Sequence, residues 1–115
     1  MKVNEFVSIL FHSRSQAHIF HLKTKSFSQH KALDNYYQSI IPLVDKFIES
    51  YQGKYSTIGQ YYSLPFTENT NKILTYFDNL LLSISKFKLK DSYLNNIIDS
   101  IYELVYSTLY NLTLK

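Results

Sequence analysis

The sequence contains no cysteine and no tryptophan, and it has only two glycines, two prolines and one arginine among 115 residues. Without cysteine the chain can form neither a disulfide framework nor a zinc–thiolate site, so a bound metal would need histidine, aspartate or glutamate ligands. So few glycines and prolines do not suit the many turns of a β-barrel or β-sandwich. No apolar run approaches the ~18 residues of a membrane span, and we expect a cytoplasmic protein with no membrane partner.

Hydrophobic residues make up 45% of the chain, and they recur at helical spacing in four segments. These segments run from about Val3 to Leu22, from Phe27 to Gln52, from Glu68 to Phe87, and from after Asp91 almost to the end of the chain. The helix boundaries have sequence signals as well. Ser26 with Gln29 predicts a capping box, Gly53 predicts a left-handed C-terminal residue, and Thr67 predicts an N-cap.

The connections between these segments predict their arrangement. Short turns join the first helix to the second and the third to the fourth, so each pair should be antiparallel. The connection from Lys54 to Phe66 is long enough to cross the length of a bundle. The sequence therefore predicts a single all-α domain over residues 1–115, a ferritin-like four-helix bundle with one long crossover between helices 2 and 3.

The second predicted helix carries four metal-ligating residue types on one side. At about 100° per residue and with His30 as zero, Asp34 lies near 40°, Asp45 near 60° and Glu49 near 100°. For any one of these residues, a solvated polar edge is the simplest interpretation. Asp34 and Asp45 are also separated by roughly 16 Å along the helix axis, which is too far for one metal site.

The positions of these four residues are symmetric about one point. The midpoint of residues 34 and 45 coincides with that of residues 30 and 49, between Ser39 and Ile40. A second copy of the helix, packed antiparallel about a two-fold axis there, would place His30 and Asp34 opposite the other chain's Asp45 and Glu49. This pattern predicts two equivalent His/carboxylate sites, each shared between two subunits.

Five metal-ligating residues follow one another at gaps of 12, 4, 11 and 4 positions: His18, His30, Asp34, Asp45 and Glu49. This spacing, with Gln16-Ala17 before the first histidine, resembles the ferroxidase motif of the Dps-like miniferritins. The resemblance implies an iron-binding protein that oxidises Fe(II) with peroxide or oxygen and stores the ferric product. It also implies a homo-oligomer built from antiparallel dimers through helices 1 and 2, with a dodecameric cage as the family's assembly.

The resemblance also assigns roles to the ligands of a di-iron site, with no catalytic residue apart from them. Asp45 and Glu49 would supply anionic oxygens that favour Fe(III), and His18 of the other subunit would complete that site. His30 and Asp34 would hold a second iron. His21, one turn from His18, is an alternative ligand, a hydrogen-bond partner or a capping group, whereas His12 is expected to be an ordinary helix residue. Zinc or manganese would also suit these donors.

Two other functions compete with iron oxidation. The chain could be a non-catalytic helical scaffold, viral in origin, that keeps the ligands as a structural metal site or an interface network. A DNA-compacting protein would need a basic surface, and the net charge is only +3. The local concentrations are Lys86, Lys88 and Lys90 with Lys54 or Lys72. Because no lysine-rich tail accompanies them, we expect weak or no binding of nucleic acid. The residue usage resembles that of an AT-rich genome, which favours a bacterial or bacterial-virus source.

Overall fold

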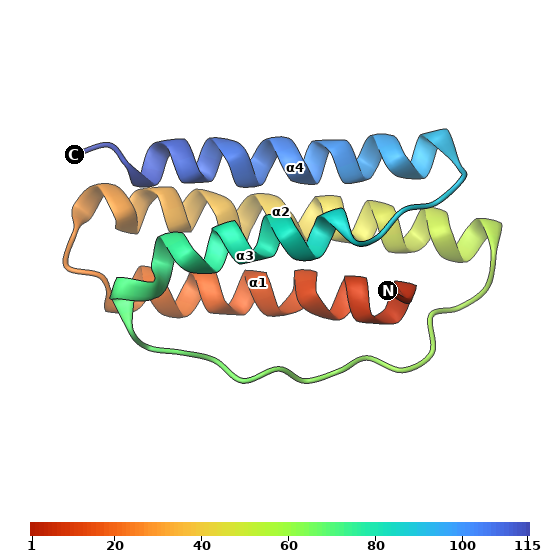
Figure 1. The fold of residues 1–115 in the computed structure, drawn as a ribbon, viewed down its shortest axis with the longest axis horizontal. Helices are drawn as coiled ribbons and strands as arrows, with labels where there is room; N and C mark the ends of the chain where they lie inside the picture. The colour runs from red at the N-terminus through yellow and green to blue at the C-terminus, as the bar shows by residue number, and fades with distance from the viewer.

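A computed structural model describes all residues 1–115 as four α-helices with no β-strand (Figure 1). The helices are α1 (Val3–Lys23), α2 (Phe27–Lys54), α3 (Ile73–Ser85) and α4 (Ser92–Leu112), and a short 3₁₀ turn, η1 (Thr70–Lys72), precedes α3. The predicted all-α class is confirmed. None of these helices combines the length and the apolar character that crossing a membrane requires.

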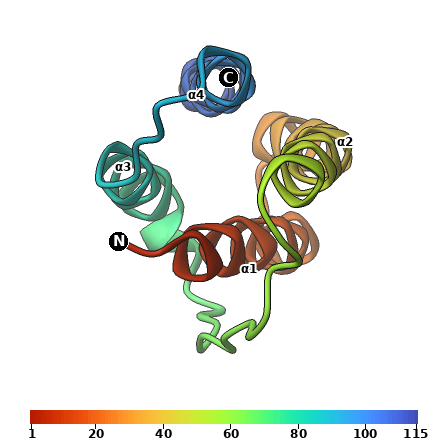
Figure 2. The ribbon, with the colours of Figure 1, turned by 90° about the vertical axis from the view of Figure 1, so that its right-hand side faces the viewer.

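The four helices stand at the corners of a bundle when it is viewed from its end (Figure 2). Around it, α1 lies beside α2, α2 beside α4, α4 beside α3, and α3 beside α1. The pairs α1/α2 and α3/α4 are antiparallel hairpins, and residues 55–69 return as an extended segment along the outside of α1 (Figure 1). This extended segment, which we call the crossover, is the long connection that the sequence predicts.

The interior is apolar, with aromatic rings filling the end of the bundle near the N-terminus. The Phe6 ring stacks on Phe87 at 4.4 Å and meets Phe47 edge-on at 5.3 Å between centroids. Near the middle, the buried hydroxyls of Ser13 and Tyr36 lie 2.8 Å apart, and Ser13 also donates to the Leu10 carbonyl. No buried side-chain nitrogen or oxygen lacks a hydrogen-bond partner, so the core carries no uncompensated polar group.

The helix ends differ from the sequence prediction at three points. Ser26 caps α2 as expected, because its hydroxyl accepts a bond from the Gln29 amide, but the Gln29 side chain accepts from Thr24 and does not complete a capping box. The prediction for Gly53 is wrong: it lies inside α2, and no residue has a positive φ. The prediction for Thr67 is also wrong, since it lies in the crossover and the helical region begins after Asn69.

Polar side chains of α1 hold the crossover by hydrogen bonds to its backbone. The hydroxyl of Ser8 accepts from the Tyr62 amide at 2.8 Å. The buried side-chain amide of Gln16 accepts from the Thr67 N–H at 2.9 Å and donates to the Thr67 carbonyl at 2.8 Å. The Thr67 backbone is thus bonded to α1, and its hydroxyl accepts from the Asn69 amide at 3.2 Å, before the helical region begins. Ser8 and Gln16 are eight positions apart, a rise of about 12 Å along α1, and the five steps from Tyr62 to Thr67 can reach about 17 Å when extended, so the crossover is long enough to make both contacts.

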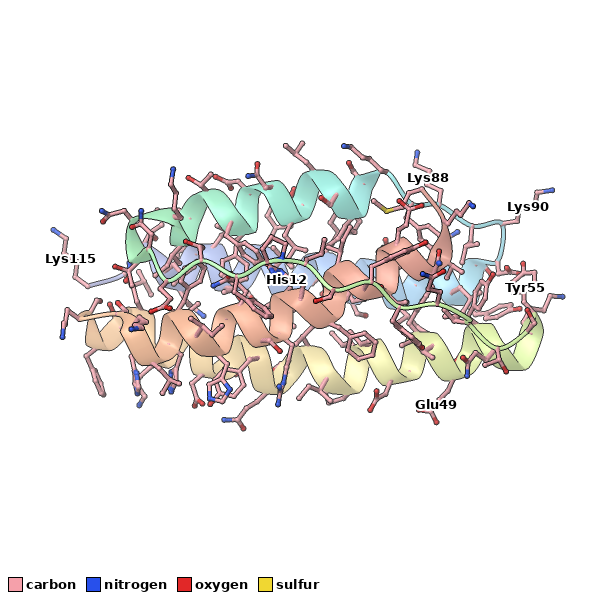
Figure 3. The ribbon with its side chains drawn as sticks, turned by 90° about the horizontal axis from the view of Figure 1, so that it is seen from below. His12, Glu49, Tyr55, Lys88, Lys90 and Lys115 are labelled. Atoms are coloured by element: carbon pink, nitrogen blue, oxygen red, sulfur yellow. The ribbon has the colours of Figure 1, made fainter.

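His12 lies between these two contacts, and it is not an ordinary helix residue. Its Nε2 donates to the Pro65 carbonyl at 2.7 Å, and its Nδ1 lies 2.8 Å from the Tyr76 hydroxyl. The ring also stacks on Phe66 at 4.6 Å between centroids. His12 therefore joins α1, the crossover and α3 at the point where the crossover passes it (Figure 3).

Candidate metal site

The end of α1 and the beginning of α2 bring two histidines into contact. The rings of His21 and His30 are stacked at 3.7 Å between centroids. Nδ1 of His21 lies 2.7 Å from the His30 carbonyl, and Nδ1 of His30 lies 2.9 Å from the His21 carbonyl. Because a carbonyl oxygen can only accept, both Nδ1 atoms are donors. In the neutral form each ring therefore keeps a lone pair on Nε2, the arrangement that orients histidine ligands in metal sites.

His18 and Asp34 lie beside this pair, with Tyr37 between them. The His18 ring stacks on Tyr37 at 4.3 Å, and Tyr37 meets His21 edge-on at 5.4 Å. The neighbouring Tyr37 hydroxyl, and then a 2.8 Å hydrogen bond from the Gln38 amide, lower the pKa of the Asp34 carboxyl, and the nearby imidazoles add to this effect. The same contact with Asp34 raises the pKa of Tyr37. Asp34 is therefore held as a carboxylate.

Asp45 and Glu49 lie further along α2, on its solvent-facing side. Both side chains are exposed and form no hydrogen bond or ion pair within the chain, whose one ion pair joins Lys23 to Glu68 at 2.8 Å. Figure 3 shows Glu49 pointing away from the bundle. Asp45 borders a shallow groove between α1 and α2, beside the exposed Phe11 and Ile41. These two carboxylates are free to contact another molecule.

The structure thus divides the predicted ligands into two groups. His18, His21, His30 and Asp34 gather near the α1–α2 turn, whereas Asp45 and Glu49 are separate from them on the same helix. No group of three or more His, Cys, Asp or Glu side chains is arranged to hold a metal ion within the chain. A site with three or more such ligands would need side chains from a second copy or a rearrangement of this cluster.

Tyr37 is a residue of this site that the sequence-based ligand prediction did not include. In the structure its ring contacts those of His18 and His21, and the neighbouring Asp34 raises the pKa of its hydroxyl. The signal was present in the spacing, because Tyr37 follows Asp34 by three residues and His30 by seven, which places all three on one helix face.

The fold and the site define an all-α protein with an imidazole cluster at one end of an α-helical hairpin and unpaired carboxylates along its outer face. The model of a family of unknown function, DUF5856, matches residues 21–112, and the chain belongs to this family. The chain is also similar to the uncharacterized 14.6 kDa protein in the mobD-ri intergenic region of Enterobacteria phage T4. The two are 32% identical over 119 residues, which cover 99% of this chain and 90% of the phage protein. No solved structure matches the chain significantly.

Proposed function

We propose that this protein is a Dps-like miniferritin with a ferritin-like bundle, whose paired subunits share a His/carboxylate site that binds and oxidises Fe(II). The observation that carries the proposal is the reciprocal His21–His30 contact. It leaves both Nε2 atoms without a hydrogen-bond partner in the chain, and both imidazoles lie near enough to Asp34 to lower the pKa of its carboxyl. Two oriented imidazoles beside an ionised carboxylate are a typical half-site for non-haem iron.

The second half-site comes from another copy of α2. With the copies antiparallel about Ser39 and Ile40, Asp45 and Glu49 of one chain approach the histidine cluster of the other. In this register His30 of one chain faces Glu49 of the other across the two-fold axis. Asp34 and Asp45 also face each other, and these like charges repel unless a cation lies between them. The charge pattern therefore suits a dimer that contains a metal better than an empty one.

Iron is the substrate in this proposal. Each Fe(II) gives up one electron, and one peroxide accepts two electrons and two protons and leaves as two waters. The carboxylates of Asp34, Asp45 and Glu49 stabilise the additional positive charge of Fe(III). Zinc or manganese would bind the same nitrogen and oxygen donors without this reaction.

A non-catalytic helical scaffold is the second candidate function. The observation that favours it is again the contact of His21 with His30, because two interhelical hydrogen bonds and a stacked ring pair also fasten α1 to α2. In that case the histidines would stabilise the hairpin, and Asp45 and Glu49 would contribute only surface charge.

Carboxylate variants with a matched control separate the two functions. The test variant is Asp45→Asn with Glu49→Gln, and the control is Asp99→Asn with Glu103→Gln, an exposed pair at the same spacing on α4. We expect the test variant to lose at least about 90% of the Fe(II) oxidation rate, and the control to keep it. Because both pairs are exposed, thermal unfolding should be nearly unchanged in both. Equal rates in the two variants would contradict the ferroxidase function.

A further inference from the structure

One end of the bundle exposes apolar side chains in a basic surrounding. Phe27 and Leu22, on either side of the α1–α2 turn, are the most exposed large hydrophobic residues of the chain, at 73% and 69%. The half-exposed Leu114 lies beside them, because its carbonyl accepts a hydrogen bond from Ser28 at 2.9 Å. We call Leu22, Phe27 and Leu114 the apolar tip.

Lysines surround the apolar tip. Lys25 lies in the turn, Lys31 lies one turn into α2 with its ammonium 5.5 Å from the Phe27 ring centroid, and Lys115 projects from the same end of the bundle (Figure 3). A fourth lysine, Lys23, is paired with Glu68. The tip therefore combines exposed hydrocarbon with unpaired positive charge.

We infer that the apolar tip docks on the surface of an anionic lipid bilayer, with Leu22 and Phe27 entering the acyl boundary and the lysines contacting lipid phosphates. This inference is independent of the proposed iron site. It requires no membrane-spanning segment and agrees with the absence of a spanning helix. It differs from the sequence-based expectation that the protein has no membrane partner.

The chemistry favours lipid over the other anionic surfaces. Peripheral binding strengthens with the apolar area that is buried and with attraction to anionic headgroups, and the tip supplies both. A nucleic acid would attract the lysines equally well, but its phosphate backbone gives no apolar environment for the side chain of Leu22. The tip is also the end of the hairpin (Figure 1), so it can reach a flat surface without the rest of the bundle interfering.

The experiment measures co-sedimentation of the full chain with vesicles of phosphatidylglycerol and phosphatidylethanolamine, and with vesicles of phosphatidylcholine alone. We expect binding to the anionic vesicles only. Substituting Lys25, Lys31 and Lys115 with Gln should weaken it roughly a hundredfold, at about fivefold per lysine. The matched control substitutes Lys86, Lys88 and Lys90 with Gln at the opposite end. Because both triple variants have the same net charge, equal weakening would overturn the inference.

A second pair of variants tests insertion of the apolar side chains. Leu22→Ser with Phe27→Ser should weaken vesicle binding at least about tenfold, whereas Leu82→Ser, at an equally exposed leucine on α3, should not. Unchanged binding of the double variant would overturn insertion. Two further results would also overturn the lipid assignment. One is binding of duplex DNA at physiological salt without binding of vesicles. The other is that the wild-type chain binds no vesicles and that Leu22→Ser with Phe27→Ser lowers its sedimentation coefficient. The tip would then be a contact between two copies of the chain.

Discussion

Two faces of the α1–α2 hairpin differ in whether their polar side chains have hydrogen-bond partners within the chain. Along the crossover, Ser8, His12 and Gln16 each have hydrogen-bond partners in the chain. On the outer face of α2, Asp45 and Glu49 have none. A polar side chain of this hairpin is structural where the chain satisfies all of its donors and acceptors. It is a candidate for an intermolecular contact where the chain leaves them free.

The largest effect is expected when two substitutions on the outer face are placed on different chains of one dimer. A purified mixed dimer of Asp34→Ala and Asp45→Ala chains has one intact and one doubly damaged site, whereas each parent homodimer has two singly damaged sites. We therefore expect little iron oxidation from either homodimer and about half the wild-type rate per dimer from the mixed one. Stopped-flow measurement of Fe(III) formation gives these rates. No recovery in the mixed dimer would contradict a shared site.

Substitutions on the face of α1 that contacts the crossover should lower the free energy of unfolding. Gln16→Ala removes both hydrogen bonds to Thr67, empties a buried side-chain position and leaves the half-buried Thr67 N–H and carbonyl without partners in the chain, so we expect a loss of about 2–4 kcal/mol in the free energy of unfolding. The matched control is Gln60→Ala, at an exposed crossover residue with no hydrogen bond from its side chain, which should change the free energy by less than about 0.5 kcal/mol. Urea unfolding measures both. Similar values for the two variants would show that the crossover is not held through Gln16.

A pH change should affect metal binding at the outer face more than the fold. Imidazoles must be neutral to bind a metal, so Fe(II) or Zn(II) affinity should fall as the pH decreases from about 7.5 to about 5. The lowered pKa of Asp34 keeps its carboxylate ionised over this range, and the loss is therefore assigned to the histidines. Isothermal titration at several pH values measures it. Equal affinity at both ends of the range would exclude histidine ligation.

Asp91 provides the smallest effect and a useful contrast with Asp45. It is the N-cap residue of α4, but its carboxylate accepts from the hydroxyls of Tyr55 and Tyr93 and makes no side-chain capping bond. The bond to Asp91 raises the pKa of Tyr55 to about 12. The stabilisation that the Tyr55–Asp91 hydrogen bond gives the fold is therefore complete below about pH 10 and is lost as the pH rises toward 12.

Ultraviolet titration of the tyrosines measures this shift. Asp91→Asn should return one tyrosine to ionisation near pH 10. A titration curve of the variant that overlays the wild-type curve would contradict the assignment.

The helices and their order were predictable because apolar residues at three- and four-residue spacing determine the buried face of each helix. The ends of α2 and α3 were not. A glycine can end a helix but does not have to, and α2 continues through Gly53. The backbone of Thr67 is hydrogen-bonded to Gln16, a residue 51 positions away. Local patterns contain no information about such distant contacts.

The candidate site was predictable only in part. The face shared by His30, Asp34, Asp45 and Glu49 follows from helix periodicity alone. The contact of His21 with His30 depends on how the α1–α2 turn closes. The sequence alone therefore left three roles open for His21: ligand, hydrogen-bond partner or capping group. His12 was misjudged for the same reason, because its partners Pro65 and Tyr76 lie in segments more than 50 residues further along the chain.

Whether two chains share each metal site can be seen in an anomalous-scattering map at the iron edge, recorded from crystals soaked in Fe(II). We expect an iron peak between the His30–Asp34 end of one α2 and the Asp45–Glu49 end of an antiparallel partner helix, with a symmetric second peak. Crystals in which these residues face solvent and bind no iron would contradict a shared site.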